Sequence, residues 1–111
     1  MILEVGKAML ERLGYRVKIA QGGRTAVGCV SEMGSDIDLV ILDLIMPGFD
    51  GGKTFDHIRE VHPEMPVILS SGYSMDGQAK EVMERGCNGF IQKPFNISEL
   101  AQKIREGLNS R

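Results

Sequence analysis

The sequence predicts an α/β fold in which helices cover both faces of a parallel β-sheet. Segments with the helical spacing of apolar residues alternate with short strand-like segments along the chain. One of these segments, residues 38–43, is a continuous apolar run between two carboxylates, as in strands that are buried on both faces. Glycine and proline residues separate the segments and mark the turns between them.

The composition fits one domain that spans residues 1–111. The chain is 42% hydrophobic and 25% charged, with a formal net charge of −2, an ordinary globular balance. Without a run of Lys and Arg, direct binding of nucleic acid is not expected. Neither a signal peptide nor an apolar run of the roughly 18 residues of a membrane span is visible. We therefore expect a cytoplasmic domain, with Cys29 and Cys87 as small hydrophobic residues in a reducing compartment.

Five helices and four strands are predicted. The first helix covers residues 2–13, where Ile2, Val5, Met9 and Leu13 recur at spacings of three and four. The last helix follows Asn96, with Glu99 in the position of a capping box. The other helices span residues 24–33, 53–61 and 75–85, and the strands span residues 15–19, 38–43, 67–70 and 89–92. This alternation indicates parallel βαβ units.

Polar residues follow three of the predicted strands. Asp43 closes the most apolar strand, Ser71 and Gly72 follow the next, and Lys93 follows the last. Because reactive groups of open α/β sheets gather beyond the carboxyl ends of the strands, these side chains are expected to converge. A carboxylate nucleophile, a hydroxyl donor and a compact cation suit a phosphoryl group that is covalently held on Asp43. Gly72 would leave room for the incoming donor.

The motifs around these residues resemble those of response-regulator receiver domains in bacterial two-component signalling. Residues 40–48, with Asp50 and Gly51, look like the phosphoacceptor strand and loop of that family. Residues 67–73 look like its fourth strand with the switch hydroxyl, and residues 90–95 like its fifth strand with a lysine and a proline. The resemblance implies a flavodoxin-like (CheY-like) three-layer αβα fold with sheet order 2-1-3-4-5. Residues 71–95 further resemble the C-terminal receivers of hybrid sensor histidine kinases.

The resemblance also implies a mechanism. A histidine kinase or phosphotransfer domain would pass a phosphoryl group from a phosphohistidine to Asp43 as a step of a phosphorelay. Any enzymatic activity would be Mg²⁺-dependent self-phosphorylation and self-dephosphorylation, with Asp43 and the backbone carbonyl of Ile45 as metal ligands. Ser71 and Phe90 would be the switch residues that rearrange around the phosphoryl group. The implied phosphate-binding residues are Ser71, Gly72 and Lys93.

The sequence departs from the family at its start. Receiver domains begin with a strand that ends in two acidic Mg²⁺ ligands, whereas residues 2–13 predict a helix here, with Glu4 as the only early carboxylate. We therefore expect an N-terminally truncated receiver without the first strand, in which Mg²⁺ binding is weakened or lost. The open edges of the flanking strands would favour a homodimer. The least favoured alternative is that residues 1–5 form the strand, because residues 7–13 would then form a crossover helix only about 10 Å long.

Other interpretations remain open. A receiver-like docking or dimerisation module without an effective metal site would share these motifs. A haloacid-dehalogenase-type phosphatase is disfavoured, since its second aspartate would stand at the position of Ile45. Ser70 is the alternative to Ser71 as the switch hydroxyl, and Phe90 also suits ordinary core packing. In isolation, Asp43 would cap a strand end and Lys93 would be a surface lysine.

Overall fold

The computed structural model describes residues 2–5, 14–20, 22–43, 51–71, 77–92 and 96–109, some of them, Asp43 included, by the backbone alone. A five-stranded parallel sheet forms the middle layer, in the order β2-β1-β3-β4-β5. The strands are β1 (Ile2–Val5), β2 (Val17–Ile19), β3 (Leu39–Asp43), β4 (Val67–Ser71) and β5 (Gly89–Gln92). The helices are α1 (Gly23–Met33), α2 (Gly51–Val61), α3 (Gly77–Glu84) and α4 (Ile97–Asn109), with a 3-10 turn, η2 (Gly34–Asp36), after α1.

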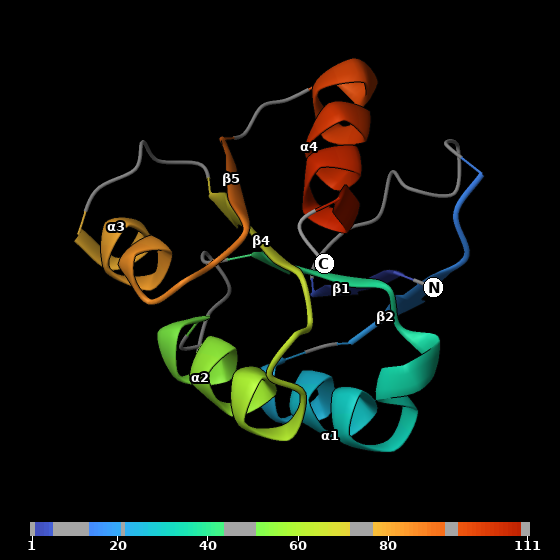
Figure 1. Ribbon diagram of the computed structural model, residues 1–111, viewed down its shortest axis with the longest axis vertical. Coiled ribbons are helices and arrows are strands. Elements are labelled where there is room, and N and C mark those ends of the chain that lie inside the picture. The colour runs from blue at the N-terminus through green and yellow to red at the C-terminus, as the bar shows by residue number, and fades with distance from the viewer. Residues whose placement is uncertain are drawn as a thin grey trace.

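The helices cover both faces of this sheet. Figure 1 shows α1 and α2 side by side on one face and α4 on the opposite face. The α/β class, the three layers and the parallel strand order predicted from the sequence are therefore confirmed.

The prediction that the central strand is missing is wrong, because β1 fills the central position of the sheet. It pairs with β2 from Ile2 to Glu4 and with β3 from Ile2 to Val5. Ile2 is 1% exposed, and its backbone N–H donates to the carbonyl of Arg16 at 2.9 Å. A short apolar run suits a buried strand as well as a helix turn, and pairing on two sides favours the strand. The predicted helix fails over residues 2–5, and residues 6–13 lie outside the described residues.

This strand removes the structural reason for the predicted homodimer. The inner edges of β2 and β3, which would be open without β1, both pair with it. Within the described sheet, unpaired strand edges remain only on the outer sides of β2 and β5.

The core consists of two apolar layers, one on each face of the sheet. Alternate residues of β3 and β4 enter opposite layers, so both strands are buried on both faces, as the apolar run of residues 38–43 predicts. The layer against α1, α2 and α3 includes Val40, Leu42, Val67, Leu69, Ala26, Val30, Phe55, Ile58 and Val82. The layer against α4 includes Ile2, Leu39, Ile41, Ile68, Ile91, Leu100 and Ile104.

A polar network fixes the starts of β4 and β5 at the opposite edge from the candidate site. The Val67 N–H donates to Oδ1 of Asn88 at 2.9 Å, and the Asn88 N–H donates back to the Val67 carbonyl at 2.9 Å. Arg59 of α2 donates to the same Oδ1 at 2.7 Å and to the carbonyls of Met65 at 3.0 Å and Gly86 at 3.2 Å. Asn88 thus sets the pairing of two strands whose far ends carry candidate site residues.

The predicted cap of the last helix is confirmed. The Glu99 N–H donates to Oδ1 of Asn96 at 2.8 Å, and Nδ2 of Asn96 donates to Oε1 of Glu99 at 3.1 Å. The first bond is the predicted N-cap contact and marks where α4 begins after β5. The second joins the two side chains, whereas in a capping box the Glu side chain accepts from the backbone N–H of the cap residue.

Candidate functional site

The carboxyl ends of β3, β4 and β5 bring several of the predicted site positions to one edge of the sheet. Asp43 ends β3 and pairs in register with Ser70, while Ser71 ends β4 and pairs with Gln92. Neighbouring strands lie about 4.8 Å apart, so these backbone positions are close together. The side chain of Asp43 is not described, and the residues Ile45, Gly72 and Lys93 lie outside the described residues.

The two serines at the end of β4 belong to opposite faces of the sheet. Ser71 is 4% exposed and follows the alternation of Val67 and Leu69, which pack toward α1, α2 and α3. Ser70 is 3% exposed and follows Ile68, which packs toward α4. The sequence presents them as interchangeable neighbours, whereas the register gives each serine a different set of contacts.

Phe90 lies on the same face of the sheet as Ser71. It pairs in register with Leu69, two residues before Ser71, and its half-buried ring packs against the layer that contains Leu69 and Val82. Diagonal neighbours on adjacent strands are within reach of a large aromatic side chain. Phe90 therefore packs as a core residue in this structure and is also placed beside the predicted switch hydroxyl.

The residues at the end of β1 do not fit a magnesium site of the family's kind. Val5, the last residue of β1, pairs with Leu42, so β1 ends beside the position of Asp43. In the sequence, Gly6 and Lys7 follow, where the family has its acidic pair. Among the described residues, no three His, Cys, Asp or Glu side chains form a group that could hold a metal ion. Mg²⁺ commonly takes one or two carboxylates as ligands, and the two residues that follow β1 in the sequence carry none.

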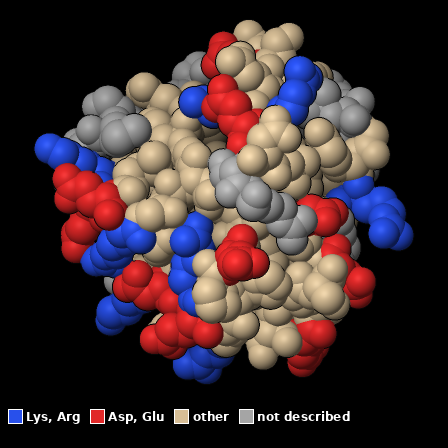
Figure 2. Space-filling model, viewed as in Figure 1, with Lys and Arg blue, Asp and Glu red and all other residues tan. Residues whose placement is uncertain are grey.

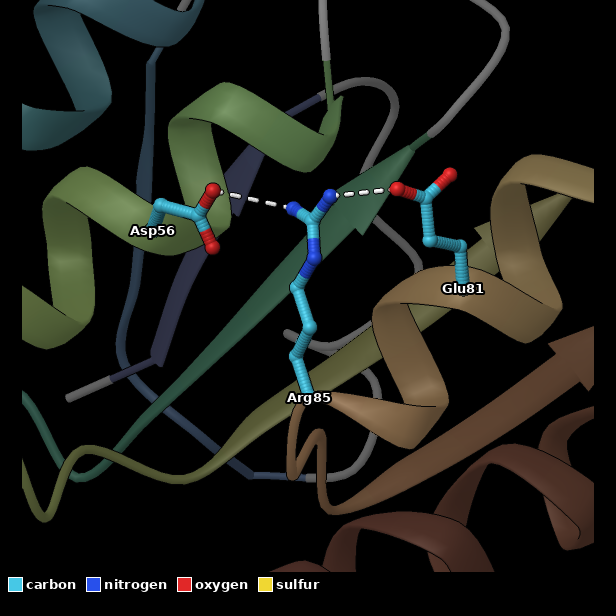
Figure 3. A network of polar contacts seen from close by, with 3 residues as sticks. All are labelled: Asp56, Glu81 and Arg85. Atoms are coloured by element: carbon cyan, nitrogen blue, oxygen red, sulfur yellow. Dashed lines mark hydrogen bonds and ion pairs between the residues drawn. The ribbon is translucent and has the colours of Figure 1, made fainter.

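A polar bridge links α3 to α2. Figure 3 shows the guanidinium of Arg85 between two carboxylates, with Nη1 2.9 Å from Oδ2 of Asp56 and Nη2 2.6 Å from Oε1 of Glu81. The hydrogen bond with Glu81 is the main cause that raises the pKa of Arg85. All three side chains are more than a third exposed, so the bridge orients α3 more than it stabilises the fold.

On the face shown in Figure 2, the distribution of charged side chains does not indicate a docking surface. Lys and Arg are mixed with Asp and Glu there, and the described residues form no broad area of one sign on that face. Within the described part of the chain, no helix is both long and apolar enough to cross a membrane.

Comparison with known proteins assigns this arrangement to a family. A family model described as response regulator receiver domain matches residues 1–105. The chain therefore belongs to the receiver domains of two-component systems, as the motifs predicted. This family interacts with histidine kinases or phosphotransfer partners, and its members generally bind Mg²⁺ in the active site.

The curated relatives include both sensor kinases and transcriptional regulators. Sensor kinase CckA of Brucella abortus (strain 2308) is 33% identical over 106 residues, which cover 96% of this chain and 11% of that protein. Transcriptional regulatory protein ZraR of Klebsiella oxytoca is 32% identical over 102 residues, covering 92% of this chain and 23% of that protein. The chain thus spans only a small part of each of these relatives.

The solved structures that are similar include isolated receiver domains. The receiver domain of NtrX from Brucella abortus is 27% identical with a TM-score of 0.88, and the similarity covers 100% of both chains. The receiver domain of sensor histidine kinase PA1611 from Pseudomonas aeruginosa PAO1 is 25% identical with a TM-score of 0.84, over 97% of this chain and 96% of that one. That domain has a magnesium ion coordinated in its active-site cleft.

Proposed function

We propose that this receiver domain accepts a phosphoryl group on Asp43 from the phosphohistidine of a cytoplasmic histidine kinase or phosphotransfer domain. The main support is the strand register, which puts the carboxyl end of β3 beside the two serines that end β4. The relative CckA is named a sensor kinase, which agrees with a place at the end of a hybrid kinase. In that case the transfer is one step of a phosphorelay.

The proposed transfer needs a nucleophile, a hydrogen-bond donor and a cation. A carboxylate oxygen of Asp43 attacks phosphorus, the O–P bond forms as the P–N bond breaks, and the donor's imidazole leaves with the bonding electron pair. Ser71 donates a hydrogen bond to a phosphoryl oxygen, and Lys93 offsets the added negative charge. Gly72 leaves space for the donor. Water later attacks phosphorus and releases inorganic phosphate, which restores the carboxylate.

The proposed response is a switch between two conformations. Ser71 and Phe90 lie on one face of the sheet, so movement of the hydroxyl toward the phosphoryl group opens space beside the aromatic ring. A phosphoryl group that binds one conformation better shifts the population toward it. The surface that changes is formed by α3, β5 and α4, which follow Ser71 in the chain.

We also propose that Mg²⁺ binding is weak in this chain. The support is the sequence after β1, where Gly6 and Lys7 replace the two carboxylates of the family. In this proposal Asp43 and the carbonyl of Ile45 are the remaining protein ligands, fewer than the family uses. Phosphorylation of this chain is accordingly expected to be slow.

The test is labelling with acetyl phosphate and Mg²⁺, followed by intact mass. We expect the addition of one phosphate at low yield, loss of labelling in Asp43→Ala, and retained labelling in Asp38→Asn, a matched aspartate before β3. Gly6→Asp/Lys7→Asp, which restores an acidic pair after β1, is expected to raise the yield at the same Mg²⁺ concentration. Labelling that persists in Asp43→Ala refutes the assignment.

A second candidate function is a docking or dimerisation module that does not need phosphorylation. The absent acidic pair favours it, since a domain without an effective metal site can keep the fold and still bind a partner. Kinase binding that is equal in the unmodified chain, the Asp43→Ala variant and the acetyl-phosphate-treated chain would support this function.

A further inference from the structure

The C-terminal end of α3 is bonded to α2 at two points. Arg85, which follows the last residue of α3, donates from Nη1 to Oδ2 of Asp56 on α2 at 2.9 Å, as Figure 3 shows. In the opposite direction, Nη2 of Arg59 on α2 donates to the carbonyl of Gly86 at 3.2 Å. Asp56 and Arg59 are three residues apart on α2, so both lie on one face of that helix. The two bonds therefore attach the end of α3 to a single face of α2.

Arg59 is itself held in place by the sheet and the core. Its Nε donates to the carbonyl of Met65 at 3.0 Å, and its Nη2 donates to Oδ1 of Asn88 at 2.7 Å. The guanidinium carbon lies 4.9 Å from the ring centroid of Phe55, which is 2% exposed, so the cation stacks over an aromatic ring of the core. Because hydrogen bonds are directional, these contacts fix the Gly86 carbonyl relative to the sheet.

The rest of α3 is held by contacts of a different kind. Ala79 and Val82 are buried, and Val82 packs in the layer that contains Leu69. Among the described side chains of residues 79–84, Glu81 bonds to Arg85 and none bonds to α2 or to the sheet. Apolar burial is non-directional, so this part of the helix can shift over the layer without breaking a directional bond.

We propose that the C-terminal end of α3 is a pivot that stays in place when Asp43 is phosphorylated, while the N-terminal part of the helix moves. Two attachments leave a helix free to rotate about the line that joins them. From Ser71 at the end of β4, the chain passes through residues 72–76 into the start of α3, so a shift of this hydroxyl reaches the helix at its N-terminal end. The movement rests on the proposed function, whereas the attachment does not.

The attachment is tested with Asp56→Ala and Glu81→Ala, since each removes one exposed carboxylate partner of Arg85 but only the first cuts a bond between two elements. The backbone N–H groups of Arg85 and Gly86 close the last turn of α3, so their hydrogen exchange reports the opening of this end. We expect their exchange rates to rise about 2–5-fold in Asp56→Ala and by less than about 1.5-fold in Glu81→Ala. A rise in Asp56→Ala that does not exceed the rise in Glu81→Ala overturns the attachment.

The movement is measured from ¹⁵N–¹H spectra before and after treatment with acetyl phosphate and Mg²⁺. The chain with the restored acidic pair is used because its labelling yield is expected to be higher, and Asp43→Ala in the same background controls for direct effects of the reagents. We expect the backbone resonance of Ala79 to shift and those of Gly86 and Asn88 to stay. Shifts at Gly86 as large as at Ala79, or no shift in α3 of the labelled chain, overturn the pivot.

Loss of one attachment should release the pivot. In Asp56→Ala, labelling is expected to shift the Gly86 resonance as well, whereas in Glu81→Ala this resonance is expected to stay. The same behaviour of Gly86 in both variants counts against the pivot. If no chain is labelled, the proposed function fails and the movement with it, while the exchange rates still decide whether α3 is attached to α2.

Discussion

Among the polar contacts that hold the sheet, those made by Asn88 are the ones whose loss is expected to destabilise it most. Its Oδ1 accepts from the Val67 N–H at 2.9 Å and from Arg59 at 2.7 Å. Val67 is fully buried, so Asn88→Ala leaves a backbone N–H without water or a partner, at a cost of about 1–3 kcal/mol. Arg59 keeps its bonds to the carbonyls of Met65 and Gly86, which limits the further loss. We expect a total destabilisation of about 2 kcal/mol, a large part of the roughly 5–15 kcal/mol of a small domain.

Urea unfolding followed by far-ultraviolet circular dichroism measures this change. With a slope of about 1–3 kcal/mol per molar urea, the midpoint of Asn88→Ala is expected to fall by about 1 M. Asn88→Asp is the matched control, because its carboxylate still accepts from Val67 and from Arg59, and its midpoint should stay close to that of the unmodified chain. A loss below about 0.5 kcal/mol in Asn88→Ala would show that the Val67 N–H finds another partner.

Two further predictions concern the surface bridge and the buried thiol. Arg85→Ala removes the ion pairs of Arg85 with Asp56 of α2 and Glu81 of α3 and should lower the midpoint less than Asn88→Ala does. An effect that is unchanged in molar salt would contradict a screened ion pair. Burial raises the pKa of the Cys87 thiol above its ordinary 9.0, so the folded chain keeps this proton to higher pH than the unfolded chain. The free energy of unfolding is therefore expected to fall as pH rises above about 9, by at most about 1.4 kcal/mol per pH unit from this group. The fall should be steeper than in Cys87→Ala, and equal slopes in the two chains would exclude the effect.

Local sequence patterns were sufficient for most elements of the fold. The apolar run before Asp43 predicted a strand buried on two faces, and Asn96 with Glu99 predicted the start of α4. In each case a few adjacent residues contain the whole signal, because burial on both faces or an N-cap is specified within one turn or strand. The motifs likewise predicted the receiver family that the comparisons show.

The prediction from sequence was wrong for residues 2–5, where the same pattern of apolar residues fits both a helix and a strand. Ile2 and Val5 are three residues apart, which suits a helix face, but a four-residue segment with three apolar residues also suits a buried strand. The structure has the strand, because β2 and β3 each present an edge that β1 satisfies through pairing on both sides. Neither of those edges is visible to a pattern confined to residues 2–13.

The sequence by itself determined which chemical groups stand at the ends of the strands and in which order. Only the tertiary structure decided that Ser70 is the register partner of Asp43 while Ser71 shares a face with Phe90. The physical reason is that side chains alternate along a strand, so a shift of one residue in pairing exchanges the two faces. That pairing is fixed between strands that are distant in the chain, through contacts such as that of Asn88 with Val67.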